Sequence, residues 1–144
     1  MEANQLFEQA LDLLLAKDMD GFVDLFAPDC TFEFPFAAGT PERLNGREAL
    51  RDYLADYPQK LDIAGFPSVV VHRTADPGTI VAEFTARGRT VATGADYEMR
   101  YVAVIVVRDG AIASYRDYWS PVMGAKASGE LAGLVTALGE EVRS

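Results

Sequence analysis

The sequence predicts an α+β fold in which an antiparallel sheet packs against helices from the N-terminal half. Up to about residue 57, apolar residues recur mainly at three- and four-residue spacing, which is typical of helices. From residue 66 the period changes to two, which is typical of strands. The resulting order is helices, one strand, a helix and then four strands in a meander, which favours α+β with an antiparallel sheet.

The first third of the chain is predicted to hold two helices and a strand. A helix is expected over residues 3–17, and a second short helix, carrying Phe22 and Phe26, ends before Pro28. Phenylalanines alternate in the segment 30–36, which indicates a short strand.

Two helix starts are predicted from capping residues. The segment 39–46 is expected to be a loop, and Asn45 with Glu48 resembles a capping box that begins a helix over about 46–57. Ser128 is expected to cap a last helix. The apolar residues that repeat in that last helix are Leu131, Leu134, Val135 and Leu138.

The second half is predicted to be a meander. Its four strands are expected over residues 66–74, 79–91, 97–107 and 111–119. The third strand is apolar on both faces, whereas an antiparallel sheet normally leaves one face to water. One face is expected to take the helices, and a second subunit is the simplest cover for the other, so we predict a homodimer. The alternative is that the C-terminal helix covers this face.

Length and charge limit the class of function. The 144 residues suit a single domain, taken as 1–144 with 124–144 as a C-terminal helical extension. The net charge of −9 argues against nucleic acid and membrane surfaces as partners. The longest apolar run, 101–107, is too short to span a bilayer, and the N-terminus lacks the order of a signal peptide. A cytoplasmic location is therefore expected.

Cysteine and histidine counts limit the chemistry further. The chain has one cysteine, Cys30, and one histidine, His72, so neither an internal disulfide nor a Cys/His zinc cluster is possible. No metal and no cofactor are expected.

One carboxylate, Asp117, lies between large aromatic residues. On a strand, Tyr115, Asp117 and Trp119 share one face. Three interpretations stay open. Asp117 is a general base whose pKa is raised by apolar surroundings, an ionised structural group bonded to tyrosine, histidine or arginine, or a solvated residue at a strand end.

The segments FAPDCTFEFPF, NGREAL and YRDYWSPV, together with the meander, resemble the nuclear transport factor 2-like superfamily, and within it the SnoaL-like and ketosteroid isomerase-like proteins. The resemblance covers about residues 5–123. It implies a cone-shaped curved antiparallel sheet wrapped around N-terminal helices, the cystatin-like or ketosteroid isomerase-like α+β barrel, with a deep apolar pocket. It also implies that Asp117 and its aromatic neighbours face into the cone.

The superfamily holds isomerases, polyketide cyclases, epoxide hydrolases, dehydratases and plain binding modules, so the fold alone does not give the function. Two known sets of catalytic residues are not kept here. The base and the two oxyanion donors of ketosteroid isomerases would fall at about Phe34, Ala103 and Ala10. Of the polar residues of limonene-epoxide hydrolase, only the Asp at position 117 remains.

Strand parity and the resemblance together predict an aromatic pocket for a hydrophobic, planar or cyclic small molecule. The alternative is that these aromatic residues simply fill the core. The expected ligand-binding residues are Phe22, Phe26, Phe32, Phe34, Phe36, Tyr53, Tyr57, Phe84, Met99 and Trp119.

The candidate catalytic residues are Asp117, Tyr101, Tyr115 and His72. Tyrosine hydroxyls can donate to a carbonyl or enolate oxygen. His72 pairs with Asp117 if it faces inward, and otherwise lies exposed at a strand end. Glu83 and Arg100 fall on the outer parity, which predicts a cross-strand or dimer pair.

Two functions remain open. One is a small-molecule enzyme, an isomerase, cyclase, dehydratase or hydrolase, that moves a proton on a hydrophobic carbonyl-containing or cyclic substrate. The other is a non-catalytic protein that binds a hydrophobic ligand in the same pocket.

Overall fold

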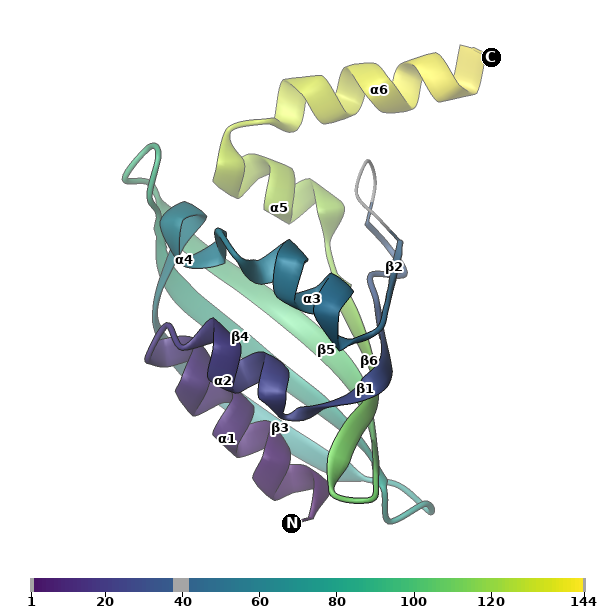
Figure 1. Ribbon diagram of the computed structural model, residues 1–144. Helices are drawn as coiled ribbons and strands as arrows, with labels where there is room; N and C mark the ends of the chain where they lie inside the picture. The colour runs from purple at the N-terminus through teal and green to yellow at the C-terminus, as the bar shows by residue number, and fades with distance from the viewer. Residues whose placement is uncertain (1, 38–41, 144) are drawn as a thin grey trace.

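The computed structural model describes residues 2–37 and 42–143. Its helices are α1 (Ala3–Leu15), α2 (Met19–Asp24), α3 (Arg47–Leu54), α4 (Tyr57–Lys60), α5 (Pro121–Ser128) and α6 (Leu131–Arg143). Its strands are β1 (Phe26–Glu33), β2 (Arg43–Asn45), β3 (Leu61–Arg73), β4 (Thr79–Thr90), β5 (Asp96–Arg108) and β6 (Ala111–Trp119). Within these residues the strands form one six-stranded sheet, in the order β2-β1-β6-β5-β4-β3. Helices α1, α2 and α3 lie across one face of the curved sheet, and α5 and α6 lie beyond one end of it (Figure 1).

The predicted α+β fold, with a curved sheet around the N-terminal helices, is confirmed. The meander β3 to β6 is antiparallel throughout. Strand β1, however, pairs in parallel with β6, with Phe32 opposite Tyr115, so the sheet is mixed. This pairing joins segments about eighty residues apart, so no turn signal in the sequence reports it.

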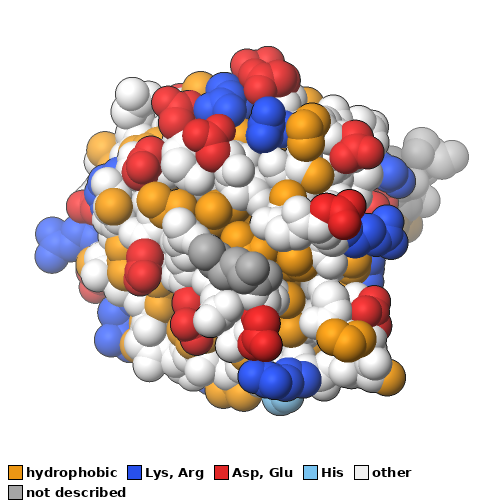
Figure 2. Space-filling view, turned by 60° about the horizontal axis from the view of Figure 1, so that its bottom comes forward, with side chains coloured by type: hydrophobic (Ala, Val, Ile, Leu, Met, Phe, Trp, Pro, Cys, Tyr) orange, Lys and Arg blue, Asp and Glu red, His pale blue; other side chains and the backbone are white. Residues whose placement is uncertain are grey.

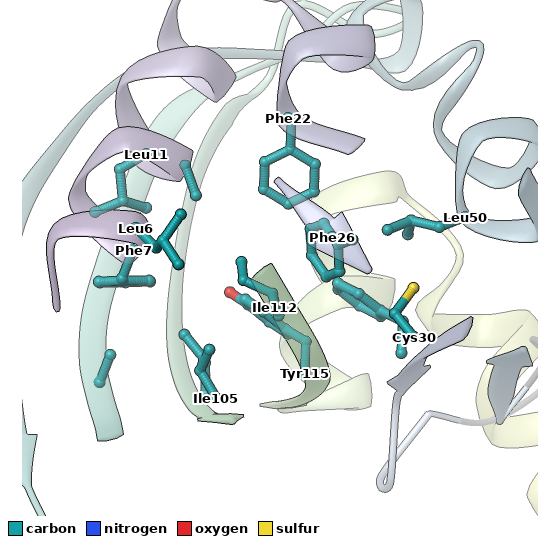
Figure 3. Packing of buried hydrophobic residues seen from close by; sticks show 14 of the residues in the cluster. Leu6, Phe7, Leu11, Phe22, Phe26, Cys30, Leu50, Ile105, Ile112 and Tyr115 are labelled. Atoms are coloured by element: carbon teal, nitrogen blue, oxygen red, sulfur yellow. The ribbon is translucent and has the colours of Figure 1, made fainter. Parts of the chain in front are cut away.

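The core fills the space between the N-terminal helices and the sheet. Helix α1 begins at a capping box formed by Glu2 and Gln5. Its buried face includes Phe7, whose ring centroid lies 5.3 Å from that of Phe84 on β4. Figure 3 shows side chains of α1, α2 and α3 converging on those of the sheet. The labelled members of this cluster are Leu6, Phe7, Leu11, Phe22, Phe26, Cys30, Leu50, Ile105, Ile112 and Tyr115.

Several helix and strand boundaries differ from the predicted ones. Helix α2 ends at Asp24, so Phe26 begins β1 instead of ending a helix. The strand ends at Glu33, and Phe36 lies beyond it. The predicted loop 39–46 contains strand β2, and its residues 39–41 lie outside the described residues.

Both capping predictions are wrong. The N-cap of α3 is Gly46, and Asn45 instead accepts a hydrogen bond from Arg43 Nε at 3.0 Å. Ser128 ends α5, a helix that Ser120 caps by accepting from the backbone of Met123. The expected helix 46–57 is also two helices, since α3 ends at Leu54 and α4 begins at Tyr57.

No described helix combines the length and the apolar character needed to cross a membrane. On the face displayed in Figure 2, basic and acidic side chains lie close together and no patch of a single sign covers the surface.

The bend of β3 depends on a glycine in its partner strand. Register shifts occur on both sides of Gly65 in β3. Gly88 on β4 lies opposite Ile63 there, and a Cβ atom at Gly88 would stand 1.9 Å from the carbonyl oxygen of Asp62. Only glycine permits this approach, so Gly88 allows the sheet to curve at this end.

We predict that Gly88→Ala lowers the free energy of unfolding by about 2 kcal/mol, because the added methyl group forces the two backbones apart. Urea denaturation measures this change. Gly65→Ala is the matched control, since a Cβ there meets nothing within 4 Å. Equal stability of the two variants would contradict this account of the bend.

Candidate active site

A cavity of about 790 Å³ opens between the inner face of the sheet and helices α3 to α6. Most of its lining is apolar, and its polar groups are tyrosine hydroxyls, one tryptophan, the hydroxyl of Ser128 and a few carboxyls. Of the predicted residues it includes Phe22, Phe32, Phe34, Tyr53, Tyr57, Phe84, Met99, Tyr101, Tyr115, Asp117 and Trp119.

Asp117 lies in the wall of this cavity. It opposes Ala103 across the β5–β6 ladder, and Tyr115 and Trp119 flank it on the same face of β6. The residue keeps some accessible surface where it borders the cavity, but its Oδ1 atom is buried and has no hydrogen-bond partner among the described residues. Burial raises the pKa of the Asp117 carboxyl to about 7. Near neutral pH the carboxyl is therefore present in both protonation states.

Tyrosines surround this carboxyl. The hydroxyls of Tyr97 and Tyr101, two inward residues of β5, share a hydrogen bond. Burial raises the pKa of Tyr97 to about 12 and the pKa of Tyr101 and of Tyr115 well above the ordinary value. Burial likewise raises the pKa of Tyr57 on α4. All four hydroxyls therefore keep their protons at neutral pH and can donate hydrogen bonds.

Two stacked ring pairs form the walls beside Asp117. The rings of Phe32 and Tyr115 lie 4.6 Å apart at 6° to each other. The rings of Phe84 and Tyr101 lie 5.1 Å apart at 16°. Flat aromatic walls of this kind suit a flat ligand.

Helix α5, which the sequence analysis did not distinguish within the C-terminal helical extension, closes part of the cavity. Gly124 packs against the Trp119 ring so closely that a Cβ would stand 3.1 Å from it. Thr90 Oγ1 donates to the carbonyl of Ala127 at 3.1 Å and ties α5 to the end of β4. The signal for α5 was present in the sequence, because Ser120 followed by Pro121 is a typical helix start.

Tyr97 was also missed. Its position on β5 has the same parity as Met99 and Tyr101, so strand alternation alone would have placed it on the inner face. It lines the cavity with them.

Two of the predicted ligand-binding residues lie elsewhere. Phe26 is 1% exposed and belongs to the core, where its ring packs against those of Phe22 and Phe32. Phe36 is 61% exposed and contacts the ring of Tyr118. Neither lines the cavity.

His72 does not join Asp117. It lies opposite Val81 in the β3–β4 ladder, and its Nε2 atom is 2.6 Å from Glu83 Oε2 on an exposed part of the sheet. Because Glu83 pairs with His72 and Arg100 lies opposite Thr85, the expected cross-strand pair of Glu83 with Arg100 is wrong, while the dimer pair stays a prediction. Among the described residues, no three His, Cys, Asp or Glu side chains are grouped to hold a metal ion.

The family model of the SnoaL-like domain matches residues 7–115, and the chain belongs to this family. The chain is 38% identical over 129 residues to the uncharacterized protein YesE of Bacillus subtilis, covering 89% of this chain and 88% of that protein. It is 35% identical over 130 residues to the uncharacterized PhzA/B-like protein PA3332 of Pseudomonas aeruginosa, covering 90% and 92%.

Solved structures agree with this assignment. A Bacillus subtilis protein with a provisional description as an isomerase is 38% identical, with a TM-score of 0.86 over 89% of this chain and 93% of that one. A protein of ketosteroid isomerase-like fold from Catenulispora acidiphila is 16% identical, with a TM-score of 0.71 over 86% and 92% of the chains, and it shares the fold alone.

We predict that Asp117→Asn stabilises the protein at pH 8 but not at pH 4. The unfolded carboxyl ionises near pH 3.9, whereas the folded one keeps its proton up to about pH 7. Stability of the wild type therefore falls between these pH values, by at most about 4 kcal/mol, and the neutral amide avoids this loss. Urea denaturation across this pH range measures the difference.

Asp96→Asn, at an exposed position on the neighbouring strand, is the control, and its difference from the wild type should not follow this curve. A stability difference for Asp117→Asn that stays constant with pH would contradict the raised pKa.

Proposed function

We propose that the protein is a cofactor-independent enzyme of the isomerase or cyclase type, in which Asp117 moves a proton on a hydrophobic carbonyl-containing or cyclic substrate. The observation that carries this proposal is a buried carboxyl with an unpartnered oxygen and a pKa of about 7, set in an aromatic cavity beside tyrosine donors. Membership of the SnoaL-like family and similarity to a protein provisionally described as an isomerase support it.

The chemistry needs no group beyond those in the cavity. The Asp117 carboxylate takes a proton from the carbon next to the substrate carbonyl, and the C–H electron pair forms a C=C bond while the carbonyl π pair moves onto oxygen. A hydroxyl of Tyr101 or Tyr115 donates to the resulting oxyanion. Protonated Asp117 then returns the proton to another carbon, which is an isomerisation. Alternatively, the enolate carbon bonds to a second carbonyl carbon while the first C=O bond re-forms, and the resulting alkoxide takes the proton from Asp117, which is a cyclisation.

The pKa of Asp117 suits this role. A general base works best when its pKa lies near the working pH, because enough of it is ionised while it still binds a proton strongly. A carboxyl of ordinary pKa would be fully ionised but a weaker base.

We predict that the protein catalyses exchange of the acidic C–H protons of β-tetralone, a bicyclic ketone with one aromatic ring, for deuterium. Asp117→Asn should slow the exchange at least about a hundredfold, the contribution typical of a general base. The rate should rise with pH through about 7, as the carboxyl loses its proton. Proton NMR in deuterated buffer measures the rate.

Phe36→Leu, an exposed position outside the cavity, is the control and should leave the rate unchanged. Wild-type exchange no faster than that of Asp117→Asn would overturn the general-base role.

A second candidate function is binding without catalysis. The positions that match the base and the donors of ketosteroid isomerases are apolar, and Ala10 and Ala103 are buried in the core. Under this alternative, substitution of Phe34 or Trp119 weakens ligand binding more than Asp117→Asn does, and no exchange occurs.

We also propose that the protein is a homodimer that buries the outer face of the sheet. Val70 is 48% exposed and Val102 is 37% exposed, and both lie in one outward row of the sheet with Tyr118 and with Glu83, whose carboxylate pairs with His72. Helix α5 packs instead against Trp119 at the cavity, so the C-terminal helices leave this face uncovered. Apolar side chains gathered on a sheet face favour association.

Val102→Glu should convert the dimer to a monomer, because it places a second carboxylate directly opposite Glu83 on the face that the dimer would bury. Sedimentation velocity measures the change. Val135→Glu on α6, 62% exposed and away from the sheet, is the control and should leave the assembly unchanged. A monomeric wild-type protein would contradict the proposal.

A further inference from the structure

The charges around the cavity indicate which molecules it accepts, an inference that rests on the proposed function. Among the described residues that line the cavity, none is Lys, Arg or His, whereas Asp117, Glu130 and Glu141 are carboxylic acids. The cation Lys60, which lowers the pKa of Tyr53 against the larger effect of burial, pairs with Asp56 at 3.2 Å. An anionic ligand would therefore find no cation in the lining and would meet the Asp117 carboxylate in an apolar setting, where repulsion is strong, whereas Glu130 and Glu141 are exposed and repel it less.

We propose that the cavity selects uncharged, flat ketones and receives the carbonyl oxygen at the hydroxyl pair of Tyr97 and Tyr101. Members of the family differ in chemistry, so membership alone implies neither that the cavity excludes anions nor that Tyr97 has a role.

The hydroxyl pair offers one free donor. Tyr97 and Tyr101 bring two O–H groups, and one of them is used in the bond between the two oxygens. Whichever oxygen donates that bond, the other keeps a proton for a ligand. A hydroxyl that accepts one hydrogen bond becomes a better donor of the next, so the pair acts as one strengthened donor.

The hydroxyl pair of Tyr97 and Tyr101 lies close enough to Asp117 along the sheet for both to contact one ligand. Asp117 lies opposite Ala103, and Tyr101 is the next inward residue of β5, opposite Trp119. Diagonal neighbours on one face of a sheet are within reach of a long side chain. A carbonyl oxygen held by Tyr101 thus leaves the adjacent C–H group near the Asp117 carboxylate. Tyr97 acts through Tyr101 and is a positioning residue.

The walls favour a flat molecule. Tyr101 stacks on Phe84, and Tyr115 on Phe32, so two pairs of rings with nearly parallel faces stand beside Asp117. A planar ring system can lie against such faces with full contact, whereas a bulky saturated one cannot.

In the resulting step, Asp117 takes the proton of the C–H group adjacent to the carbonyl. The C–H electron pair forms the C=C bond, and the carbonyl π pair passes to the oxygen. The O–H of Tyr101 donates to this oxygen and keeps its proton, because burial holds the pKa of that hydroxyl well above its ordinary value. The proton on Asp117 then returns to carbon, so no oxidant, reductant or further reactant is needed.

Binding tests the charge selection. Uncharged β-tetralone and anionic β-naphthoate are bicyclic probes of similar size, and titration calorimetry at pH 8 compares them. We expect β-naphthoate to bind at least about tenfold more weakly. Asp117→Asn removes one negative charge and should narrow this gap, whereas Phe36→Leu should not. Equal binding of the two probes to the wild type, or tighter binding of the anion, would overturn the selection.

Substitution of the tyrosines tests the docking of the carbonyl. Tyr101→Phe should slow exchange of β-tetralone about a hundredfold, as loss of an oxyanion donor does. Tyr97→Phe should slow it about tenfold, the factor for one ordinary hydrogen bond, with the loss in kcat and little change in KM. Tyr118→Phe, which changes a tyrosine that does not line the cavity, is the control and should change neither value.

The carbonyl carbon resonance of bound β-tetralone gives a readout that a purely structural role would not move. Hydrogen bonding to the pair should shift it downfield, and the shift should shrink in Tyr97→Phe and Tyr101→Phe alone. Exchange and a carbonyl shift that are unchanged in Tyr97→Phe would overturn the docking, while the loss in Asp117→Asn would still support the proposed function. The predicted binding preference and carbonyl shift without any exchange would overturn the proposed function and leave the docking intact.

Discussion

The removal of water from one carboxyl, that of Asp117, is the constraint on which the site depends. A buried carboxylate without a partner is costly, and the native state lowers this cost by keeping the proton on up to about pH 7. The Oδ1 atom has no hydrogen-bond partner among the described residues, and the surroundings are aromatic rings with tyrosine hydroxyls at their margins. The same feature that destabilises the folded chain at high pH thus gives it a base of useful strength.

The fold makes this arrangement by filling only part of the space inside the sheet. Helix α1 and the start of β1 pack against β4, β5 and β6 with Phe7, Phe26 and Ile105, each at most 1% exposed. Toward the other end, the helices stand off from the sheet and the aromatic side chains line a cavity instead of a core. The bend of β3 over Gly88 belongs to that end, since Ile63 beside it lines the cavity.

Strand alternation predicted most of this site, because the rule is local and the meander is regular. It placed Tyr115, Asp117 and Trp119 on one face, and the structure agrees. It could not decide the face of His72, because the register shifts earlier in β3 change which residues face inward, and a run of valines hides the parity. Phe36 was misplaced because the strand ends three residues before it.

Long-range features were beyond the sequence patterns. The parallel pairing of β1 with β6 depends on where the whole meander returns, and no residue of either strand specifies it alone. The hydroxyl contact between Tyr97 and Tyr101 depends on side-chain packing four residues apart on one strand. The resemblance supplied the fold and the family, while the chemistry of the cavity came from the placement of individual side chains.

The most direct test of the account is the pKa of the Asp117 carboxyl in the free protein. NMR titration of the carboxyl carbon measures it, with Asp117→Asn to assign the signal. The account predicts a value of about 7. A value at or below about 4, that of an ordinary solvated or well-bonded carboxylate, would contradict it and with it the role of Asp117 as a base.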